Sequence, residues 1–350
     1  MASVRRIAKQ VGVSVATVSR VLNNHPHVDS ETRKRVLAAA DRSSYVRFSQ
    51  RSQAVLGLVY PGDIVKADHG GFDQAVLSGM LEGVHEHRYD VKIISIARDK
   101  SPQESFAQFF ARKGLRGVVL RTFAHTRQIC VKIAEEGFPA VVLADRFTEP
   151  DVNYICTDSR LDSMRAVRHL ADLGHRRIAL IVHSVADTDH ADRRLAYQDA
   201  MKEAGLPIDP ELLSENYASA DNAANTITRF MGLPNPPTAI FITDPLATIG
   251  ALRRCLELGI KVPEELSIVG FDDSDVRHHT FPTCTAVVQD ARMLGVEAAR
   301  WLTSVTAAEP GGESQRLAMV RQTRLEINRT TAPPSRKVIR VHSDGTRYEA

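Results

Sequence analysis

The sequence is poor in the residues that bind metals or form disulfides. Its 350 residues include four cysteines, Cys130, Cys156, Cys255 and Cys284. No two of them form a Cys-x-x-Cys pair, and none has a histidine at metal-ligand spacing. We therefore interpret the cysteines as small buried hydrophobic residues and predict no metal site.

Long apolar runs are also absent. No stretch of 18 apolar residues occurs, and the basic N-terminus lacks the apolar segment of a signal peptide. We expect a cytoplasmic protein without membrane contacts, with its thiols in a reducing compartment.

The motifs of common enzyme classes are missing as well. The sequence contains no G-x-S-x-G, no G-x-G-x-x-G or Walker loop, no H-E-x-x-H and no cysteine-nucleophile pattern. We expect no catalytic residues, no cofactor and no enzymatic activity. A length of 350 residues with 43% hydrophobic content nevertheless supports two or three domains with a large core.

Basic residues are concentrated at the N-terminus. Residues 1–51 contain ten Lys and Arg against three Asp and Glu, a charge of +7, although the whole chain carries only +3. The remaining residues are therefore slightly acidic. This asymmetry predicts a polyanionic partner for the N-terminal segment.

Residues 4–45 show the pattern of three short helices. The first helix has apolar residues at helical spacing, namely Val4, Ile7, Ala8 and Val11. Gly12 permits a tight turn, and Ser14 can cap a second helix over residues 15–23. The third begins after Asp29 or Ser30 and ends near Tyr45. Such a basic three-helix unit is typical of helix-turn-helix DNA-binding domains.

The run IAKQVGVSVATVSRVLN at residues 7–23 resembles the DNA-binding headpiece of the LacI/GalR family of bacterial regulators. By that resemblance, three residues face base edges: Val15, Ala16 and Arg20. Four others hold the phosphate backbone: Ser14, Thr17, Ser19 and Asn23. The chemistry agrees, because an arginine can bond a guanine edge bidentately and hydroxyls and amides suit phosphate oxygens.

The segment after the third helix departs from the family. LacI/GalR proteins usually continue with a hinge helix that begins Tyr-x-Pro-Asn, whereas here Tyr45 is followed by VRFSQRSQ, without proline. Arg47 and Arg51 are candidate contacts to phosphates or a narrow minor groove, with Phe48 as a wedge. A short polar linker with one incidental aromatic explains the segment equally well. The shortening puts in doubt the family's coupling of effector binding to the hinge.

Beyond residue 54, apolar strands alternate with helical stretches, which predicts parallel sheets. The clearest strands are residues 55–60, 91–96, 117–120, 140–143, 177–182, 239–242 and 267–271. The resemblance continues through GLRGVVL, LGHRRIA and VPEELSIVGFDD, and it covers residues 3–328.

The resemblance implies a body of the periplasmic-binding-protein type, with two doubly wound parallel-sheet lobes joined by three crossovers. We place these crossovers near residues 158–162, 288–292 and 318–322. The predicted organisation is an all-α helix-turn-helix headpiece (1–46), a short atypical linker (47–54), a two-lobed α/β effector-binding and dimerisation domain (55–330) and a tail (331–350). The sequence leaves disorder of the tail open.

Ligands of such sheets bind at the carboxyl ends of the strands. Strand ends and family positions together select the candidate effector contacts: Phe72, Asp73, Arg146, Asp158, Arg193, Asp244 and Asp272. We favour ligand contact for Arg146 and Arg193, whereas Asp158 and Asp244 would serve equally as helix caps, and Asp272 stays open. The acidic run at residues 187–192 either faces the ligand or is solvated, and we favour solvation.

The sequence therefore predicts a transcription regulator. The resemblance implies repression, because repression is the usual activity in the family. Its expected partners are double-stranded operator DNA, a sugar-like effector and a second copy of the chain, as a homodimer or a tetramer. Sugar acids and nucleosides also fit the proposed contacts. The alternatives are a solute-binding protein of transport type, which leaves the helix-turn-helix unexplained, and a DNA-binding regulator without an effector.

Overall fold

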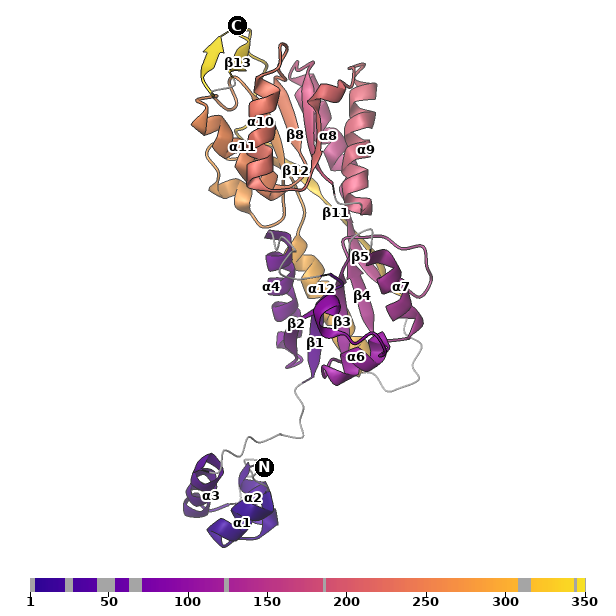
Figure 1. The fold of residues 1–350 in the computed structure, drawn as a ribbon, viewed down its shortest axis with the longest axis vertical. Coiled ribbons are helices and arrows are strands. Elements are labelled where there is room, and N and C mark those ends of the chain that lie inside the picture. Colours follow the sequence, from indigo (N-terminus) through magenta and orange to yellow (C-terminus); the bar gives the residue numbers. More distant parts are fainter. Residues whose placement is uncertain are drawn as a thin grey trace. The chain divides into compact units, whose positions relative to one another are not determined.

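The computed structural model describes residues 4–22, 28–42, 54–62, 71–122, 126–184, 187–307, 316–342 and 345–349. The chain forms two compact units, residues 1–53 and 54–350 (Figure 1). Within the described ranges, no helix combines the length and apolar content that a membrane span requires. The four cysteines are buried, which confirms their interpretation as core residues.

The first unit contains the three predicted helices, α1 (Val4–Val11), α2 (Val15–Leu22) and α3 (Ser30–Arg42). Gly12 makes the turn between α1 and α2 with φ +72°, a conformation that costs glycine little. The Ser14 hydroxyl then accepts a 3.0 Å hydrogen bond from the Thr17 backbone N–H and caps α2. The predicted turn and cap are thus both present.

The headpiece core comes from one face of each helix. Its buried residues are Ile7, Ala8, Val11, Val18, Val21, Val36 and Ala39. Asp29 caps α3 by accepting hydrogen bonds from the backbone N–H groups of Glu31 and Thr32, and Arg35 Nη2 donates to the Val11 carbonyl at 2.6 Å. This last bond ties α3 to the end of α1.

The second unit has two α/β lobes, which we call the N-lobe and the C-lobe. In the described part of the N-lobe, six parallel strands lie in the order β11-β5-β4-β3-β1-β2. The strands are β1 (Val55–Tyr60), β2 (Asp90–Ser95), β3 (Gly117–Arg121), β4 (Ala140–Leu143), β5 (Tyr154–Asp158) and β11 (Ala318–Gln322). The helices are α4 (Gly71–His85), α5 (Ile96–Asp99), α6 (Phe106–Arg112), α7 (Arg127–Glu135) and α12 (Ala291–Ala307).

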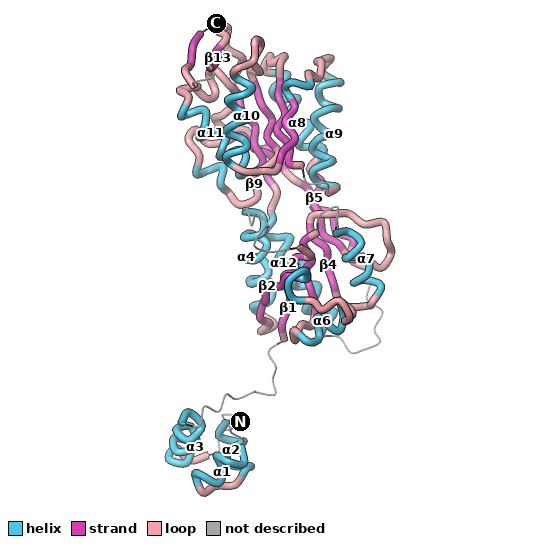
Figure 2. The backbone as a smooth tube through the Cα atoms, in the orientation of Figure 1, coloured by secondary structure: helices cyan, strands magenta, loops and turns pink. Residues whose placement is uncertain are grey.

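The described C-lobe repeats this architecture with strand order β12-β10-β9-β8-β6-β7, in which only β12 is antiparallel to its neighbour. The strands are β6 (Ile178–His183), β7 (Leu213–Asn216), β8 (Ala239–Ile242), β9 (Ser267–Asp272), β10 (Thr285–Val288) and β12 (Arg324–Glu326). The α-helices are α8 (Arg160–Asp172), α9 (Thr188–Glu203), α10 (Ala220–Met231) and α11 (Pro245–Glu257); the 3-10 turns are η3 (Pro210–Leu212) and η4 (Val276–His279). Helices cover both faces of each sheet (Figure 2).

The chain passes between the lobes three times. It leaves the N-lobe after β5, returns between β10 and α12, and passes back at Thr323 between β11 and β12. The first two crossovers lie where the sequence predicts them. The third lies one residue beyond the predicted range 318–322, because those residues form β11 itself.

Close packing of two helices fixes the start of α4, which carries two candidate effector residues. An added Cβ at Gly79 would lie 1.8 Å from the Arg292 carbonyl oxygen, and one at Gly295 would lie 2.2 Å from the Val76 carbonyl oxygen. The backbones of α4 and α12 therefore touch, as Figure 1 shows for the two adjacent helices.

The C-terminal tail is ordered in its described residues, although the sequence leaves its disorder open. A hairpin of β13 (Ile339–Val341) and β14 (Arg347–Glu349) closes one end of the C-lobe (Figure 1). Ile339 and Val341 are 3% and 4% exposed and join the core formed with α10 and α11. Burial of these two side chains explains the order.

Candidate DNA-binding surface and effector site

The structure places the described DNA-contact candidates on the outer side of α2. Val15, Ala16, Ser19 and Arg20 are exposed, and Thr17 is half-buried. Val18 and Val21, on the opposite side of the helix, are 0% and 3% exposed. Exposed Ser14 has its hydroxyl 2.8 Å from that of Thr17, besides capping the helix. α2 therefore presents an arginine, hydroxyls and small apolar groups on one surface, as a major-groove helix requires.

The remaining DNA-contact candidates, Asn23, Arg47 and Arg51, lie outside the described residues. The same is true of Phe48 and of the linker up to residue 53. Their predicted roles therefore stay predictions.

In the N-lobe, the chain continues from β1 to β2 on one side and from β3 to β4 on the other, so β1 and β3 flank the point where the strand order reverses. Arg121, at the end of β3, donates from Nε to Asp73 Oδ1 at 2.6 Å and lies over the Phe72 ring at 4.4 Å from its centroid. Burial and the charge of Asp73 raise the pKa of Tyr60 at the end of β1. Phe72 and Asp73 thus both contact an arginine that the sequence did not single out, and their predicted effector contact stays a prediction.

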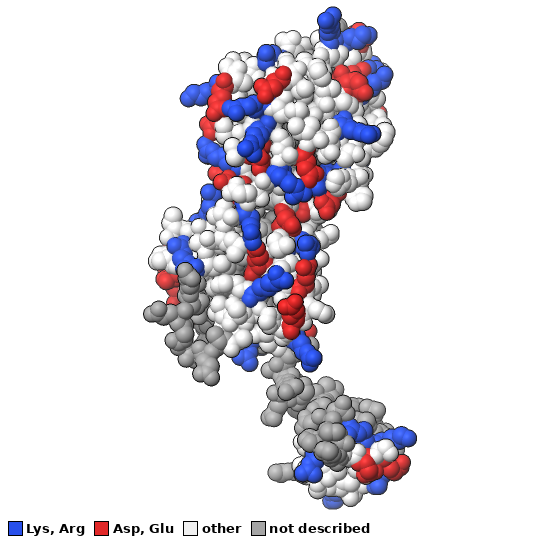
Figure 3. Space-filling model, turned by 180° about the vertical axis from the view of Figure 1, so that it is seen from behind, with Lys and Arg blue, Asp and Glu red and all other residues white. Residues whose placement is uncertain are grey.

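The boundary between the lobes is held by polar contacts after β4. The Arg146 guanidinium pairs with Asp192 on α9, and the Arg146 backbone N–H donates to the Thr188 hydroxyl at 3.1 Å. Asp145, fully buried, pairs with Arg127 and accepts a 3.0 Å hydrogen bond from Thr188 Oγ1. These contacts join the end of β4 to the first turn of α9. Figure 3 shows acidic and basic side chains intermixed on both lobes of the face it displays.

Arg193 occupies the corresponding place in the C-lobe. It is 4% exposed, its guanidinium stacks 3.6 Å from the centroid of the Phe271 ring, and its Nη1 donates to the Thr243 carbonyl at 2.9 Å. Thr243 directly follows β8, and β6 and β8 flank the strand-order reversal of this sheet. Arg193 therefore lies where the topology places a ligand.

Asp158 and Asp244 act in the structure at the starts of helices. Asp158 Oδ1 accepts from the Arg160 backbone N–H at 3.0 Å, and Asp244 Oδ1 caps α11 by accepting from the Ala247 N–H at 3.0 Å. Burial raises the pKa of Asp244 despite that bond. The capping interpretation left open by the sequence is thus realised for both, and their predicted ligand contacts stay untested.

Asp272 holds a loop. Its carboxylate accepts hydrogen bonds from the backbone N–H groups of Ser274, Val276 and Arg277, and it pairs with Arg277 Nη1 at 2.8 Å. Arg277 in turn contacts Glu326 on β12, beyond the third crossover. Through Arg277, Asp272 therefore links the loop after β9 to the strand that returns from the N-lobe. An effector that contacts Asp272, as predicted, would bind a carboxylate that already accepts these hydrogen bonds.

The acidic run at 187–192 is not the solvated loop that the sequence favoured. Residues 188–192 form the first turn of α9, and Asp187 caps it by accepting from the His190 N–H at 2.8 Å. Burial opposes ionisation of Asp187, but the charge and hydrogen bonds of His190 hold its pKa below the usual range. Asp189 is 2% exposed, and burial raises its pKa to about 8. Asp189 is buried and the other acidic residues of the run are half-buried, because α9 begins against the N-lobe.

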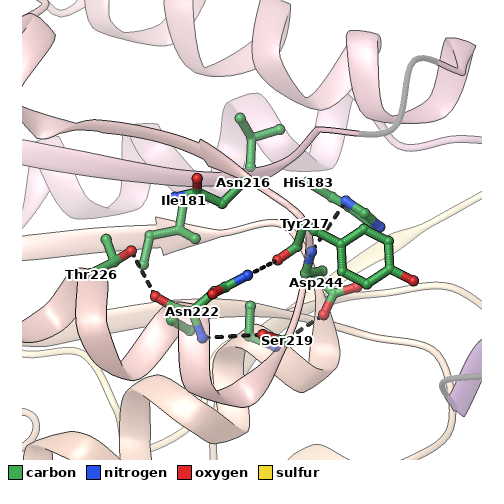
Figure 4. A pocket seen from close by; sticks show the side chains of 12 residues that line it. Ile181, His183, Asn216, Tyr217, Ser219, Asn222, Thr226 and Asp244 are labelled. Carbon is green, nitrogen blue, oxygen red and sulfur yellow. Dashed lines mark hydrogen bonds between the residues drawn. The ribbon is translucent and has the colours of Figure 1, made fainter. Parts of the chain in front are cut away.

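A pocket opens beside these residues at the carboxyl ends of β6, β7 and β8 (Figure 4). His183, Tyr217 and Asp244 line it, and the His183 ring lies edge-on to Tyr217 at 5.0 Å and to His190 at 5.1 Å between centroids. Burial and the neighbouring His190 lower the pKa of His183 to about 4. The described residues contain no His, Cys, Asp and Glu cluster suited to a metal ion. Aromatic rings with amide and hydroxyl neighbours suit a small polar organic ligand.

The structure therefore brings most effector candidates to one boundary. Arg146, Arg193 and Asp244 lie near the start of α9, and the charge of Asp187 also acts on Arg121, which holds Phe72 and Asp73. Sequence reasoning missed several polar residues there: Arg121, Asp145, His183, Asp187, Asp189, Tyr217, Asp273 and Gln289. For six of them the available signal was their position just after a predicted strand or in the acidic run. Tyr217 and Gln289 follow β7 and β10, which were not predicted, so no such signal was available for them.

Two family models match the chain. The model described as "Bacterial regulatory proteins, lacI family" matches residues 3–47, and the "Periplasmic binding protein-like domain" matches residues 167–327. Together they cover more than half of the sequence.

Curated relatives match along nearly the whole length. The HTH-type transcriptional repressor CytR of Escherichia coli (strain K12) is 28% identical over 323 residues, which are 90% of this chain and 93% of CytR. The HTH-type transcriptional regulator DegA of Bacillus subtilis (strain 168) is 26% identical over 336 residues, 93% of this chain and 97% of DegA.

Solved structures agree in fold. The complex of the transcriptional regulator CelR with cellobiose has 25% identity and a TM-score of 0.66, covering 94% of this chain and 100% of CelR. The lac repressor dimer bound to operator and the anti-inducer ONPF has 21% identity and a TM-score of 0.71, covering 95% and 99%. With a capped helix-turn-helix unit followed by a two-lobed body, the chain belongs to the LacI/GalR family of bacterial transcription regulators.

Proposed function

We propose that this regulator represses transcription by placing α2 in the major groove of double-stranded operator DNA. A hydroxyl-rich, sugar-like effector at the lobe boundary would change its operator affinity. The observation that carries the DNA-binding part is the surface of α2, where Arg20, Val15 and Ala16 are exposed above a buried Val18. Arg20 would bond a guanine edge, and the two apolar residues would meet thymine methyl groups.

The effector part is supported by the polar lobe boundary. Arg146, Asp145 and Asp192 join the lobes in the arrangement described, so a ligand that binds this arrangement better than an opened one shifts the equilibrium toward it. Two relatives support these choices. CytR is named a repressor, which supports repression, and CelR was solved with cellobiose, which supports a sugar-like effector. Asn23, Arg47 and Arg51 would add DNA contacts, and the segment 47–54 would carry the coupling.

The proposed active form is a homodimer, or a tetramer made from two dimers, because one headpiece reads only one half-site of a two-fold operator. A relative, the lac repressor, was solved as a dimer on its operator. Since its target is the chromosome, the protein would act in the cytoplasm, and it would act by binding rather than by catalysis. A monomer in sedimentation velocity, alone and on operator DNA, contradicts the assembly.

The DNA-binding part is tested with fluorescence anisotropy on a duplex from the protein's own promoter region, over a salt series. We expect sequence-selective binding with a steep salt dependence. Arg20→Ala should weaken operator binding by about 1–3 kcal/mol and relax the base preference at one position. Arg336→Ala, which removes an equal charge from an exposed site in the body, is the matched control. Unchanged affinity and base preference in Arg20→Ala would show that the base contact is wrongly assigned.

A further inference from the structure

The carboxylates at the lobe boundary are not all neutralised. Five of them have a basic partner: Asp73 with Arg121, Asp145 with Arg127, Asp187 with His190, Asp192 with Arg146 and Asp272 with Arg277. Three further carboxylates near the start of α9 make no ion pair in the described part of the chain: Asp189, Asp244 and Asp273. Their charges must be balanced in another way.

Arg193 is the cation that these three carboxylates share. Its charge acts on Asp189, Asp244 and Asp273. Its hydrogen bonds go instead to the Thr243 carbonyl at 2.9 Å and the Ser159 hydroxyl at 3.4 Å. One guanidinium cannot neutralise three carboxylates, so the site would carry an excess of negative charge if all three were ionised.

The same site also has buried acceptor atoms without donors. Asp189 Oδ1, Thr243 Oγ1 and Gln289 Oε1 have no hydrogen-bond partner among the described residues, and their side chains belong to residues that are 2%, 0% and 4% exposed. One donor at the same boundary, Arg146 Nε, is unpaired as well, and a ring hydroxyl of a ligand could accept from it. Gln289 uses its Nε2 to donate to Asp273 at 2.5 Å, which leaves its oxygen unmatched. A hydroxyl such as that of Thr243 can donate as well as accept, so it is satisfied by either kind of partner. The oxygens of Asp189 and Gln289 indicate a missing donor, because an unpaired buried acceptor costs stability.

We propose that the effector carries a protonated amine beside its hydroxyl groups, as an amino sugar does, with the ammonium on Asp189 at the start of α9. This inference rests on the effector role proposed above. An ammonium supplies three donors and no acceptor, so it matches both the unpaired acceptors and the excess charge. The carboxylate of a sugar acid supplies acceptors only, so it could pair with Arg146 Nε but not with the oxygens of Asp189 and Gln289.

The titration of the buried acids supports this assignment. Burial raises the pKa of Asp189 to about 8 and that of Asp273 to about 7, so without a ligand each holds a proton over part of the neutral range. Asp189 faces Asp187 and Arg193 on its own helix and Asp145 and Arg146 from the end of β4. A bound cation takes the place of these protons, because it supplies the positive charge directly.

The test is calorimetric titration of the full-length protein with two ring-matched series. One is glucosamine, glucose and glucuronate, and the other is galactosamine, galactose and galacturonate. We expect an amino sugar to bind about tenfold or more tightly than its neutral parent, and the uronates to bind most weakly. Operator anisotropy with each compound measures the regulatory effect separately.

Two variants test the residue. Asp189→Asn should lose about tenfold or more in amino-sugar affinity, whereas Asp221→Asn, at an exposed carboxylate on α10, should bind as the wild type does. If circular dichroism shows Asp189→Asn to be misfolded, Asp273→Asn replaces it with the same expected loss.

The outcomes separate the two proposals. A neutral sugar or uronate that binds as tightly as its amine overturns the amine inference, and the effector role stands if that compound alters operator affinity. An amine that binds without altering operator affinity supports the ligand class and overturns the regulatory role. Failure of all six compounds to bind overturns the inference. Operator binding measured without any compound still tests whether the protein is a DNA-binding regulator.

Discussion

At the scale of single residues, Asp189 combines burial with a position between the lobes. Its neighbours of like charge are Asp187 and Asp145, and its neighbours of opposite charge are Arg193 and Arg146. Burial nevertheless dominates and raises its pKa from an ordinary 3.8 to about 8. The folded state therefore keeps a proton that the unfolded state loses above pH 4.

This difference fixes the sign of a pH dependence. The contribution of Asp189 to the free energy of unfolding falls as pH rises from about 4 to about 8, by at most about 1.4 kcal/mol per pH unit, and is constant outside that window. We predict that Asp189→Asn removes this loss, so the variant gains stability relative to the wild type with rising pH.

Urea denaturation at pH 5, 6, 7 and 8 measures this effect. Asp221→Asn, an exposed carboxylate, should differ from the wild type by a constant within about 0.5 kcal/mol. A constant difference for Asp189→Asn as well would mean that the carboxyl is solvated rather than buried.

The same residue shows a limit of sequence reasoning. Six residues with three aspartates predict a solvated loop from composition, because charged residues are seldom buried. The structure buries Asp189 and half-buries Asp187, since α9 begins where the lobes meet and Arg146 and Thr188 connect across the boundary. The sequence pattern cannot show that a helix start has a partner more than forty residues away.

At the scale of elements, sequence patterns found the buried strands well. All seven predicted strands, such as β1 and β8, occur within one residue of their expected ends, because each is a short apolar run. Five strands of the two large sheets were not among those predicted: β5, β7, β10, β11 and β12. Of these, β7 (LSEN) and β11 (AMVRQ) lie at sheet edges and contain exposed polar residues, so pairing with β6 and β5 rather than composition defines them. The strands β5 and β10 are buried in the sheets but contain threonine, and β5 also contains cysteine, so their apolar pattern is weaker.

The contact between α4 and α12 is an element-scale feature that the sequence did not show. The Gly295 position is so close to α4 that an added Cβ would lie 2.2 Å from the Val76 carbonyl oxygen. We predict that Gly295→Ala separates the helices and lowers the free energy of unfolding by about 1–3 kcal/mol. The resulting movement of α4 would also shift Phe72 and Asp73, which lie at its start, away from Arg121.

Chemical denaturation provides the measurement, with Gly62→Ala as the control. No atom lies within 4 Å of a Cβ built at Gly62, and its backbone is not left-handed, so this variant should change stability by no more than about 1 kcal/mol. Equal stabilities of the two variants would contradict the close packing of the helices.

At the scale of the whole molecule, the proposed dimer needs a self-complementary apolar surface. Among the described large hydrophobic residues, Phe281 is 97% exposed, in the loop between η4 and β10. We select this ring as the candidate dimer contact, because aromatic residues are enriched among those that contribute most to protein–protein binding. The loop follows Asp272 and Arg277, so such an interface would connect directly to the effector site.

We predict that Phe281→Asp weakens dimerisation by about 2 kcal/mol or more, because the charge would be buried in the dimer but not in the monomer. Leu161→Asp is the matched control, since Leu161 is a 52% exposed apolar residue on α8. Sedimentation velocity over a concentration series measures both. If the Phe281→Asp dimer dissociates while the Leu161→Asp dimer does not, the operator affinity of Phe281→Asp should also fall, because a monomer reads only a half-site. Equal dimerisation of both variants and the wild type would place the interface elsewhere on the body.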